Sequence, residues 1–253
     1  DGMIVRNNLF WAPESQLNPG THWEKKNGAE NNWHISSRNE NDTRWVSYAS
    51  GINNAAYYNN IILNNDFLFS GYHMDYSSNT TNVYFGFNTL VTGKETKDLF
   101  NMVFGAKDGS DSKFTGIIEN NIFDIKAALS GNDSIVFRNN IMPASAASSV
   151  KGPGDIYTNS AGLQNALVEL NYPIPAIGAA TVDMAALRTA VDLNNYRLKS
   201  GSSAVNKAVT SSPNSQTQIP SLAKSQDFFK NSRIGVPDIG AVEYGGVYHT
   251  STP

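Results

Sequence analysis

Residues 70–76, Ser-Gly-Tyr-His-Met-Asp-Tyr, place several side chains that could do chemistry in one short segment. His73 can take up or release a proton near neutral pH, and Asp75 adds a carboxylate two positions later. The rings of Tyr72 and Tyr76 can stack on a flat ligand while their hydroxyl groups form hydrogen bonds. We predict that His73 and Asp75 are catalytic and that both tyrosines bind substrate. The alternative is a surface loop without a catalytic role.

Two aspartates flank a glycine farther along the chain. Asp108 and Asp111 lie on either side of Gly109, and carboxylate oxygens are the ligands that Ca²⁺ prefers. We predict a metal site at Asp108 and Asp111, and Ca²⁺ is the only cofactor that the sequence suggests. The segment matches no recognisable calcium-binding loop, so a solvated turn is the alternative.

All four tryptophans lie in residues 11–50, a polar stretch that also contains proline, glycine and several asparagines. This composition predicts a long loop, and long loops on a rigid scaffold often carry binding function. An indole ring can stack on the apolar face of a sugar and donate a hydrogen bond to a hydroxyl group. We predict that Trp23, Trp33 and Trp45 bind a carbohydrate. Alternatively, these rings form the small core that such a loop needs.

A repeated pattern indicates the elements that would position these groups. Five segments have apolar or small residues five and three positions before an Asn, and an apolar residue two positions after it. Residues two apart share one face of a strand, and Asn tolerates the backbone of a turn. We predict that each segment is one rung of a parallel β-solenoid, with the Asn side chains hydrogen-bonded along its inside. The segments are Met3, Val5, Asn8 and Phe10; Ala55, Tyr57, Asn60 and Ile62; Val83, Phe85, Asn88 and Leu90; Gly116, Ile118, Asn121 and Phe123; and Ile135, Phe137, Asn140 and Met142.

The same pattern predicts a column of outward-facing residues, two positions before each Asn. Glu119 and Arg138 occupy this position in successive rungs, so we expect them to form an exposed ion pair worth less than ~1 kcal/mol. If the rungs are not stacked, the asparagines mark unrelated loops of a β-sandwich, and this pair does not form.

Composition excludes several function classes. The net charge of −3 and the low share of charged residues, 16%, give no basic patch for nucleic acid. No apolar run reaches the roughly 20 residues of a membrane-spanning helix. The chain has no cysteine, which removes disulfides, thiolate metal sites and cysteine nucleophiles.

The rung pattern ends near residue 143, and an Ala-, Ser- and Pro-rich stretch follows. Because a solenoid must cover its last coil, we predict an irregular C-terminal cap, with a short helix from Thr181 to about Val191. The predicted divisions are coils over 1–150, interrupted by the Trp-rich loop at 11–50, a C-terminal coil and cap of the same domain over 151–245, and the start of a linker at 246–253.

Several C-terminal motifs together resemble a known ending. They are Asn-Ser-Ala-Gly-Leu-Gln-Asn at 159–165, Asn-Tyr-Arg-Leu-Lys-Ser-Gly-Ser-Ser-Ala-Val-Asn at 195–206, Asp-Phe-Phe at 227–229, Arg233, and Pro-Asp-Ile-Gly-Ala-Val-Glu-Tyr at 237–244. With the rungs, they resemble secreted bacterial right-handed parallel β-helix proteins, many of which are polysaccharide lyases of the pectate lyase type or related glycosidases. Ser203 departs from the family pattern, which usually has Pro there.

The resemblance implies an all-β, right-handed parallel β-helix that is secreted and binds a polysaccharide or oligosaccharide. We expect the chain to be the C-terminal portion of an extracellular polysaccharide-degrading enzyme. Further N-terminal coils and other modules are expected in the same precursor. The alternative is a non-catalytic carbohydrate-binding or cell-surface β-solenoid.

Two reactions are compatible with this resemblance. A uronate lyase usually has a Lys or Arg base and often uses Ca²⁺ to hold the substrate carboxylate. A glycoside hydrolase needs two carboxyl groups about 5–10 Å apart. Glu119 is the third residue that we predict to be catalytic, as a partner of Asp75 across adjacent coils. Glu24, Glu30 and Glu40 are other possible donors, and sequence spacing does not choose among them.

Overall fold

The computed structural model shows an all-β molecule built from three parallel sheets, which we call A, B and C. The structure describes residues 3–11, 35–36, 45–48, 54–63, 66–69, 80–91, 101–104, 114–124, 128–131, 135–146, 150–164, 192–211 and 220–246. Sheet A consists of β1 (Met3–Arg6), β5 (Ala55–Tyr58), β8 (Thr80–Gly86), β11 (Phe114–Glu119) and β14 (Ile135–Arg138). Sheet B consists of β2 (Leu9–Trp11), β6 (Ile61–Leu63), β9 (Thr89–Val91), β12 (Ile122–Asp124), β15 (Ile141–Pro143) and β16 (Ile156–Thr158). Sheet C consists of β3 (Ile35–Ser36), β4 (Trp45–Tyr48), β7 (Asp66–Phe69), β10 (Asn101–Phe104) and β13 (Ala128–Gly131).

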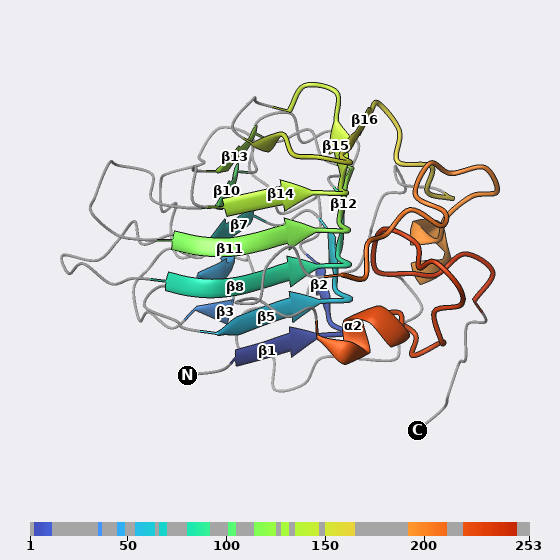
Figure 1. The fold of residues 1–253 in the computed structure, drawn as a ribbon, viewed down its shortest axis with the longest axis horizontal. Coiled ribbons are helices and arrows are strands. Elements are labelled where there is room, and N and C mark those ends of the chain that lie inside the picture. The colour runs from blue at the N-terminus through green and yellow to red at the C-terminus, as the bar shows by residue number, and fades with distance from the viewer. Residues whose placement is uncertain are drawn as a thin grey trace, which may run out of the picture.

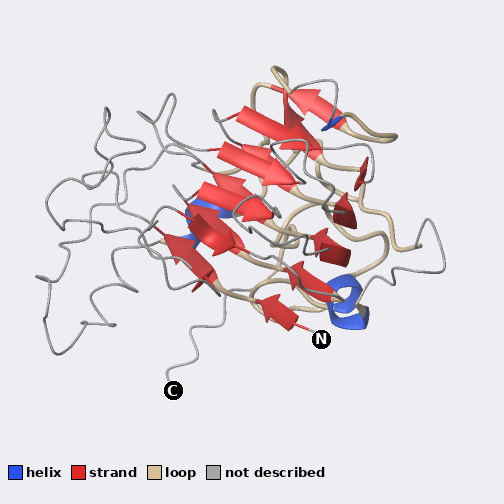
Figure 2. Ribbon diagram, turned by 90° about the vertical axis from the view of Figure 1, so that its left-hand side faces the viewer, coloured by secondary structure: helices blue, strands red, loops and turns tan. Residues whose placement is uncertain are grey.

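The chain passes from sheet A to B to C and then begins the next coil in sheet A. The first coil contributes two strands to sheet C, because β3 pairs with β4 at the edge of that sheet before β5 begins the second coil. All paired strands in the described residues are parallel. The coils rise from β1 to β14 in Figure 1, and the side view in Figure 2 shows the strands stacked in layers. The direction of travel around the rising stack makes the solenoid right-handed. The predicted parallel β-helix is confirmed, and the β-sandwich alternative is wrong.

The apolar residues of the predicted rungs form the core inside the coils. They pack in one cluster that runs the length of the stack, from Met3 and Val5 in the first rung to Met142 in the fifth. Gly116 is the one position of the pattern without an apolar side chain, because a Cβ atom there would lie only 2.6 Å from the carbonyl oxygen of Val83. The register of the paired sheet A strands places equivalent residues of all five rungs beside each other, as the spacing predicts.

The predicted asparagine ladder is present inside the turn between sheets A and B. In each step, the backbone N–H and the Nδ2 group of one Asn both donate to Oδ1 of the Asn in the next coil, at distances of 2.9–3.3 Å. The last step ends on a carboxylate, because Asn140 donates to Oδ1 of Asp155. The ladder consists of Asn8, Asn60, Asn88, Asn121, Asn140 and Asp155.

The residue before each ladder position has a left-handed backbone, which lets the chain turn sharply from sheet A to sheet B. Its φ lies between 51° and 57° at Asn7, Asn59, Phe87, Asn120 and Asn139. In the sixth rung Gly154, with φ 76°, takes this place before Asp155. This Gly-Asp rung was not predicted, since neither residue matches the asparagine pattern.

The predicted loop over residues 11–50 contains strand residues. Trp11 ends β2, and residues 35–36 and 45–48 form β3 and β4 at one edge of sheet C. Residues 12–34 and 37–44 lie outside the described residues, as does the predicted helix at 181–191.

The C-terminal segment, defined here as residues 192–211 and 220–246, packs along the outer face of sheet B (Figure 1). It is irregular, as predicted, apart from η3 (Leu193–Tyr196) and α2 (Ser221–Ser225). Its apolar residues and the outward-facing residues of sheet B form a second core. The central strands of sheet B, β6 and β9, are thus buried on both faces, whereas β16 at its edge is partly exposed. No helix in the described ranges is long and apolar enough to cross a membrane.

Candidate functional site

Most of the predicted site residues lie outside the described residues. Tyr72, His73, Asp75 and Tyr76 fall between β7 and β8, and Asp108 and Asp111 fall between β10 and β11. Trp23 and Trp33 fall between β2 and β3. Trp45 begins β4, and only its backbone position is described. Glu119 is the predicted site residue whose side chain is described.

The strands do determine where two of these segments are attached. Residues 70–79 and 105–113 both join sheet C to sheet A, in consecutive coils. The strands that precede them, β7 and β10, are paired, and so are β8 and β11, which follow them. The segment with the predicted catalytic residues and the segment with the predicted metal ligands are therefore anchored side by side on the solenoid.

Glu119 ends β11 and pairs with Arg138 of the adjacent strand β14. Nε of Arg138 donates to Oε2 of Glu119 at 2.6 Å, so the predicted proximity is confirmed. The expectation of an exposed pair is wrong, because the Glu119 side chain is fully buried. The C-terminal segment covers the pair, and Nη2 of Arg138 donates to the carbonyl oxygen of Ser211. A polysaccharide cannot reach Glu119 unless this segment moves.

Tyr84 is the second titratable group of this buried cluster. Its hydroxyl group and Oε1 of Glu119 form no geometrically ideal hydrogen bond in the described structure, yet they lie close enough to affect each other's pKa. Burial raises the pKa of Tyr84 well above its usual value, and the nearby charge of Glu119 raises it further. Burial also raises the pKa of Glu119, while Arg138 opposes the rise. A raised carboxyl pKa suits a general acid, but this one lacks access to substrate.

Arg233 fixes the C-terminal segment to the solenoid. Its guanidinium group is buried and lies over the ring of Phe87, 4.5 Å from the ring centre. Burial lowers the pKa of Arg233, whereas the charges of Glu243 and Asp227 raise it. The three nitrogens donate to five acceptors: the carbonyl oxygens of Gln226, Asp238 and Gly240, the carboxylate of Glu243 and Oδ1 of Asn59.

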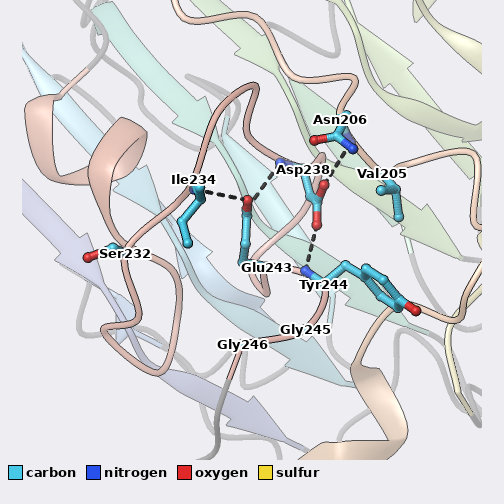
Figure 3. A pocket seen from close by; sticks show the side chains of 9 residues that line it. All are labelled: Val205, Asn206, Ser232, Ile234, Asp238, Glu243, Tyr244, Gly245 and Gly246. Atoms are coloured by element: carbon cyan, nitrogen blue, oxygen red, sulfur yellow. Dashed lines mark hydrogen bonds between the residues drawn. The ribbon is translucent and has the colours of Figure 1, made fainter.

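A pocket of about 170 Å³ opens beside this network (Figure 3). The two carboxylates that line it, those of Asp238 and Glu243, already accept hydrogen bonds from the protein. Oδ1 and Oδ2 of Asp238 accept hydrogen bonds from the backbone of Asn206 and Tyr244, at 2.7 and 2.5 Å. Glu243 accepts from the backbone of Ile234 and Asp238 and from Arg233. These acids hold loops together, and the pocket shows no free carboxylate for a reaction.

The outer side of four of these turns binds the C-terminal segment, a structural role that sequence reasoning missed. Nδ2 of Asn7 and of Asn59 donate to backbone carbonyls at 226–228, and Asn120 exchanges two hydrogen bonds with the backbone of Val209. Asn139 donates to the carbonyl oxygen of Lys207. The available signal was the repeated Asn-Asn pair, of which the inner ladder needs only the second member.

The described residues contain no group of three or more His, Asp or Glu side chains that could hold a metal ion. The predicted ligands Asp108 and Asp111 lie outside those residues. Comparison of the sequence with protein-family models and with curated proteins found no match.

Proposed function

We propose that this chain is the C-terminal portion of an extracellular polysaccharide-degrading β-helix, acting as a uronate lyase or a glycoside hydrolase. The observation that supports this most is the attachment of residues 70–79 and 105–113 to paired strands of consecutive coils. Neighbouring strands are about 4.8 Å apart, so groups on both segments could act on one polymer lying across the coils.

In this proposal His73 and Asp75 carry out proton transfer, and Tyr72 and Tyr76 stack on sugar rings. Asp108 and Asp111 would supply oxygen ligands to Ca²⁺, which would hold a substrate carboxylate. The bacterial, secreted location and the further coils and modules of the precursor rest on the resemblance of the C-terminal motifs.

The test incubates the full chain with a panel of uronate and neutral polysaccharides. A lyase produces the ultraviolet absorbance of an unsaturated sugar, and a hydrolase produces reducing ends. We expect His73→Ala and Asp75→Asn to abolish that signal. The matched controls, His249→Ala and Asp192→Asn, should keep it, because neither residue belongs to the proposed site. Product formation that survives both site variants would contradict the assignment.

Non-catalytic carbohydrate binding is the second candidate, and the burial of Glu119 favours it. The one predicted catalytic residue that is described has a structural partner and no access to a polymer. In this case the protein migrates more slowly through a gel that contains the glycan than through a gel without it, and it does not cleave the glycan. We then expect Trp23→Ala, Trp33→Ala or Trp45→Ala to restore the electrophoretic mobility that the chain has without glycan. The control is Tyr157→Ala, which removes an exposed aromatic ring from β16 and should leave the retardation unchanged. Equal mobility in all variants would exclude the tryptophans as the binding residues.

A further inference from the structure

The C-terminal segment presents exposed apolar side chains around the pocket beside Arg233. Six large apolar side chains of the described residues are exposed, and two of them, Ile234 and Tyr244, line this pocket. A third, Val236, lies two positions after Ile234. Single exposed apolar side chains need no explanation, but a group of them at a concave place is typical of a binding surface. The pocket is therefore a candidate ligand site.

The size and the mixed lining of the pocket suit one sugar ring. Its volume of about 170 Å³ equals that of about six water molecules at ~30 Å³ each. The ring of Tyr244 is 45% exposed, and a sugar can stack its apolar face on such a ring. Asn206 adds an exposed amide group to the same pocket (Figure 3). An aromatic face beside polar side chains matches a ligand that is apolar on one side and carries hydroxyl groups at its edge.

Buried hydrogen bonds fix the walls of the pocket before a ligand arrives. Asp238, only 2% exposed, accepts from the backbone N–H groups of Asn206 and Tyr244. Glu243 accepts from the backbone N–H groups of Ile234 and Asp238. The two carboxylates thus hold the parts of the chain that carry the stacking ring, the amide and Ile234. A preformed pocket of this kind loses little affinity to the ordering of loops on binding.

The polar groups of the pocket favour a ligand that donates hydrogen bonds and has no negative charge. A carboxylate offers about four acceptor sites, and Asp238 uses two of them within the protein. The other sites can accept hydrogen bonds from sugar hydroxyl groups. Arg233 bonds all five of its N–H groups to protein acceptors, so it offers no donor to an anion. A uronate would instead face the carboxylates of Asp238 and Glu243.

We propose that this pocket binds one neutral pyranose residue of a glycan, which stacks on Tyr244 and forms hydrogen bonds with Asp238 and the amide of Asn206. The pocket binds the sugar without cleaving it, because both carboxylates are needed to hold the protein around it. The site belongs to the C-terminal segment on sheet B, whereas residues 70–79 and 105–113 join sheet C to sheet A. It goes beyond the proposed function, since neither cleavage nor the tryptophans enter its argument.

The test titrates the ¹⁵N-labelled full chain with three matched pairs of probes: methyl glucoside, galactoside and mannoside, each with its uronide. We expect a neutral probe to shift the amide signals of Ile234, Tyr244 and Gly245 with a Kd of about 1 mM, the usual strength for a ligand of this size. Its uronide should bind at least tenfold more weakly. No shift with any neutral probe, or equal affinity for the uronide, would overturn the proposal. So would shifts that appear with CaCl₂ and with none of the sugars.

Two substitutions test the assigned contacts. Tyr244→Ala removes the ring but keeps the backbone N–H that bonds Asp238, and it should weaken binding of the neutral probe at least tenfold. Asn206→Gly removes the amide, and glycine accepts the left-handed backbone found there, with φ 55°. This variant should weaken binding severalfold.

The matched control is Tyr157→Ala, which removes an exposed ring from β16 and should leave the affinity unchanged. The ¹⁵N spectrum of each variant also shows whether it is folded. Unchanged affinity in Tyr244→Ala would refute the proposed stacking. Because the readout is the binding of a single sugar, a failure to cleave polysaccharide would count against the proposed function alone.

Discussion

At the scale of single residues, the paired asparagines divide two tasks. The first member has a left-handed backbone and faces outward, and in four rungs its Nδ2 group binds the C-terminal segment. The second member faces inward and forms the ladder. Asn suits both positions, since it tolerates left-handed geometry and has one donor and one acceptor group in its side chain.

The ladder should be most sensitive to substitution at its centre. Asn88→Ala leaves the buried backbone N–H and Nδ2 groups of Asn60 without their acceptor, at a cost of about 2–4 kcal/mol. Asn8→Ala removes fewer buried bonds and should cost about 1 kcal/mol. Urea denaturation of both variants measures the difference. Similar losses of unfolding free energy at the two positions would contradict the claim that the buried ladder bonds stabilise the fold.

Arg233 is predicted to be irreplaceable by lysine. Arg233→Lys keeps the charge but cannot reach five acceptors, so buried groups around it lose partners. We expect a loss of about 3 kcal/mol or more in the free energy of unfolding. The control is Arg6→Lys at an exposed position, which should change stability by less than about 0.5 kcal/mol. A comparable small effect at both sites would contradict the fixing role of Arg233.

Glu119 should make stability depend on pH. Its pKa in the folded protein is raised by burial, so the folded state binds the proton more tightly than the unfolded state does. The resulting stabilisation is complete below the ordinary value of 4.5 and is lost as the pH rises through the raised pKa.

The corresponding measurement compares wild type with Glu119→Gln, which cannot ionise. Between pH 4.5 and the raised pKa, wild type should lose stability relative to the variant as pH increases. Unfolding free energies from urea titrations at several pH values give this difference, in which the contributions of other carboxyl groups cancel. Parallel pH profiles would show that the pKa of Glu119 is not raised.

At the scale of elements, close packing joins the C-terminal segment to sheet B. Gly240 has φ 98°, and a Cβ atom there would lie 2.6 Å from Cδ1 of Ile122 and 3.0 Å from Oγ1 of Thr89. Its backbone N–H also donates to the carbonyl oxygen of Asn120. The segment can approach the coils this closely because Gly240 has no side chain.

Gly240→Ala should therefore cost about 3 kcal/mol or more, since it combines backbone strain with overpacking. Gly235→Ala is the matched control, because Gly235 has φ 70° but no atom within 4 Å of the added Cβ. That variant should lose only the strain, roughly 1–2 kcal/mol. Thermal unfolding of both variants separates the two terms. Equal shifts would mean that the segment does not press against sheet B.

The elements differ in how far the sequence predicts them. Sheets A and B are predictable, because apolar residues two apart and an Asn at a fixed offset recur in five rungs. Sheet C has no such marker, so β7 and β10 were not identified. The sixth rung was missed because Gly154 and Asp155 replace the Asn pair by other residues that suit the same geometry.

The burial of Glu119 could not be predicted from the residues near it in the sequence. Its neighbour Arg138 follows from the repeat, but the covering residue Ser211 is 73 positions from Arg138 in the chain. Nothing in the spacing of the C-terminal motifs shows that they pack along the side of the coils. Long-range contacts of irregular segments depend on tertiary packing, which periodicity does not report.

At the scale of the whole molecule, sheet B is shared by two cores. The inner core contains Ile62, Leu90, Phe123 and Met142 from this sheet, and the outer core contains its alternate residues, such as Ile61 and Ile122. Removal of either core would expose the other face of the same strands. We therefore expect the solenoid and the C-terminal segment to unfold together, and this rigid frame supports the connections proposed to act on polysaccharide.

Hydrogen exchange of asparagine side chains, with ¹⁵N-labelled Asn, tests most directly the claim that an inner ladder joins the coils. The Nδ2 hydrogens of Asn60, Asn88, Asn121 and Asn140 should exchange only through global unfolding, because all four groups are buried and bonded. Asn159, which is exposed, should exchange at the rate of a free amide. Free-amide rates at the four ladder positions would contradict the stacked solenoid.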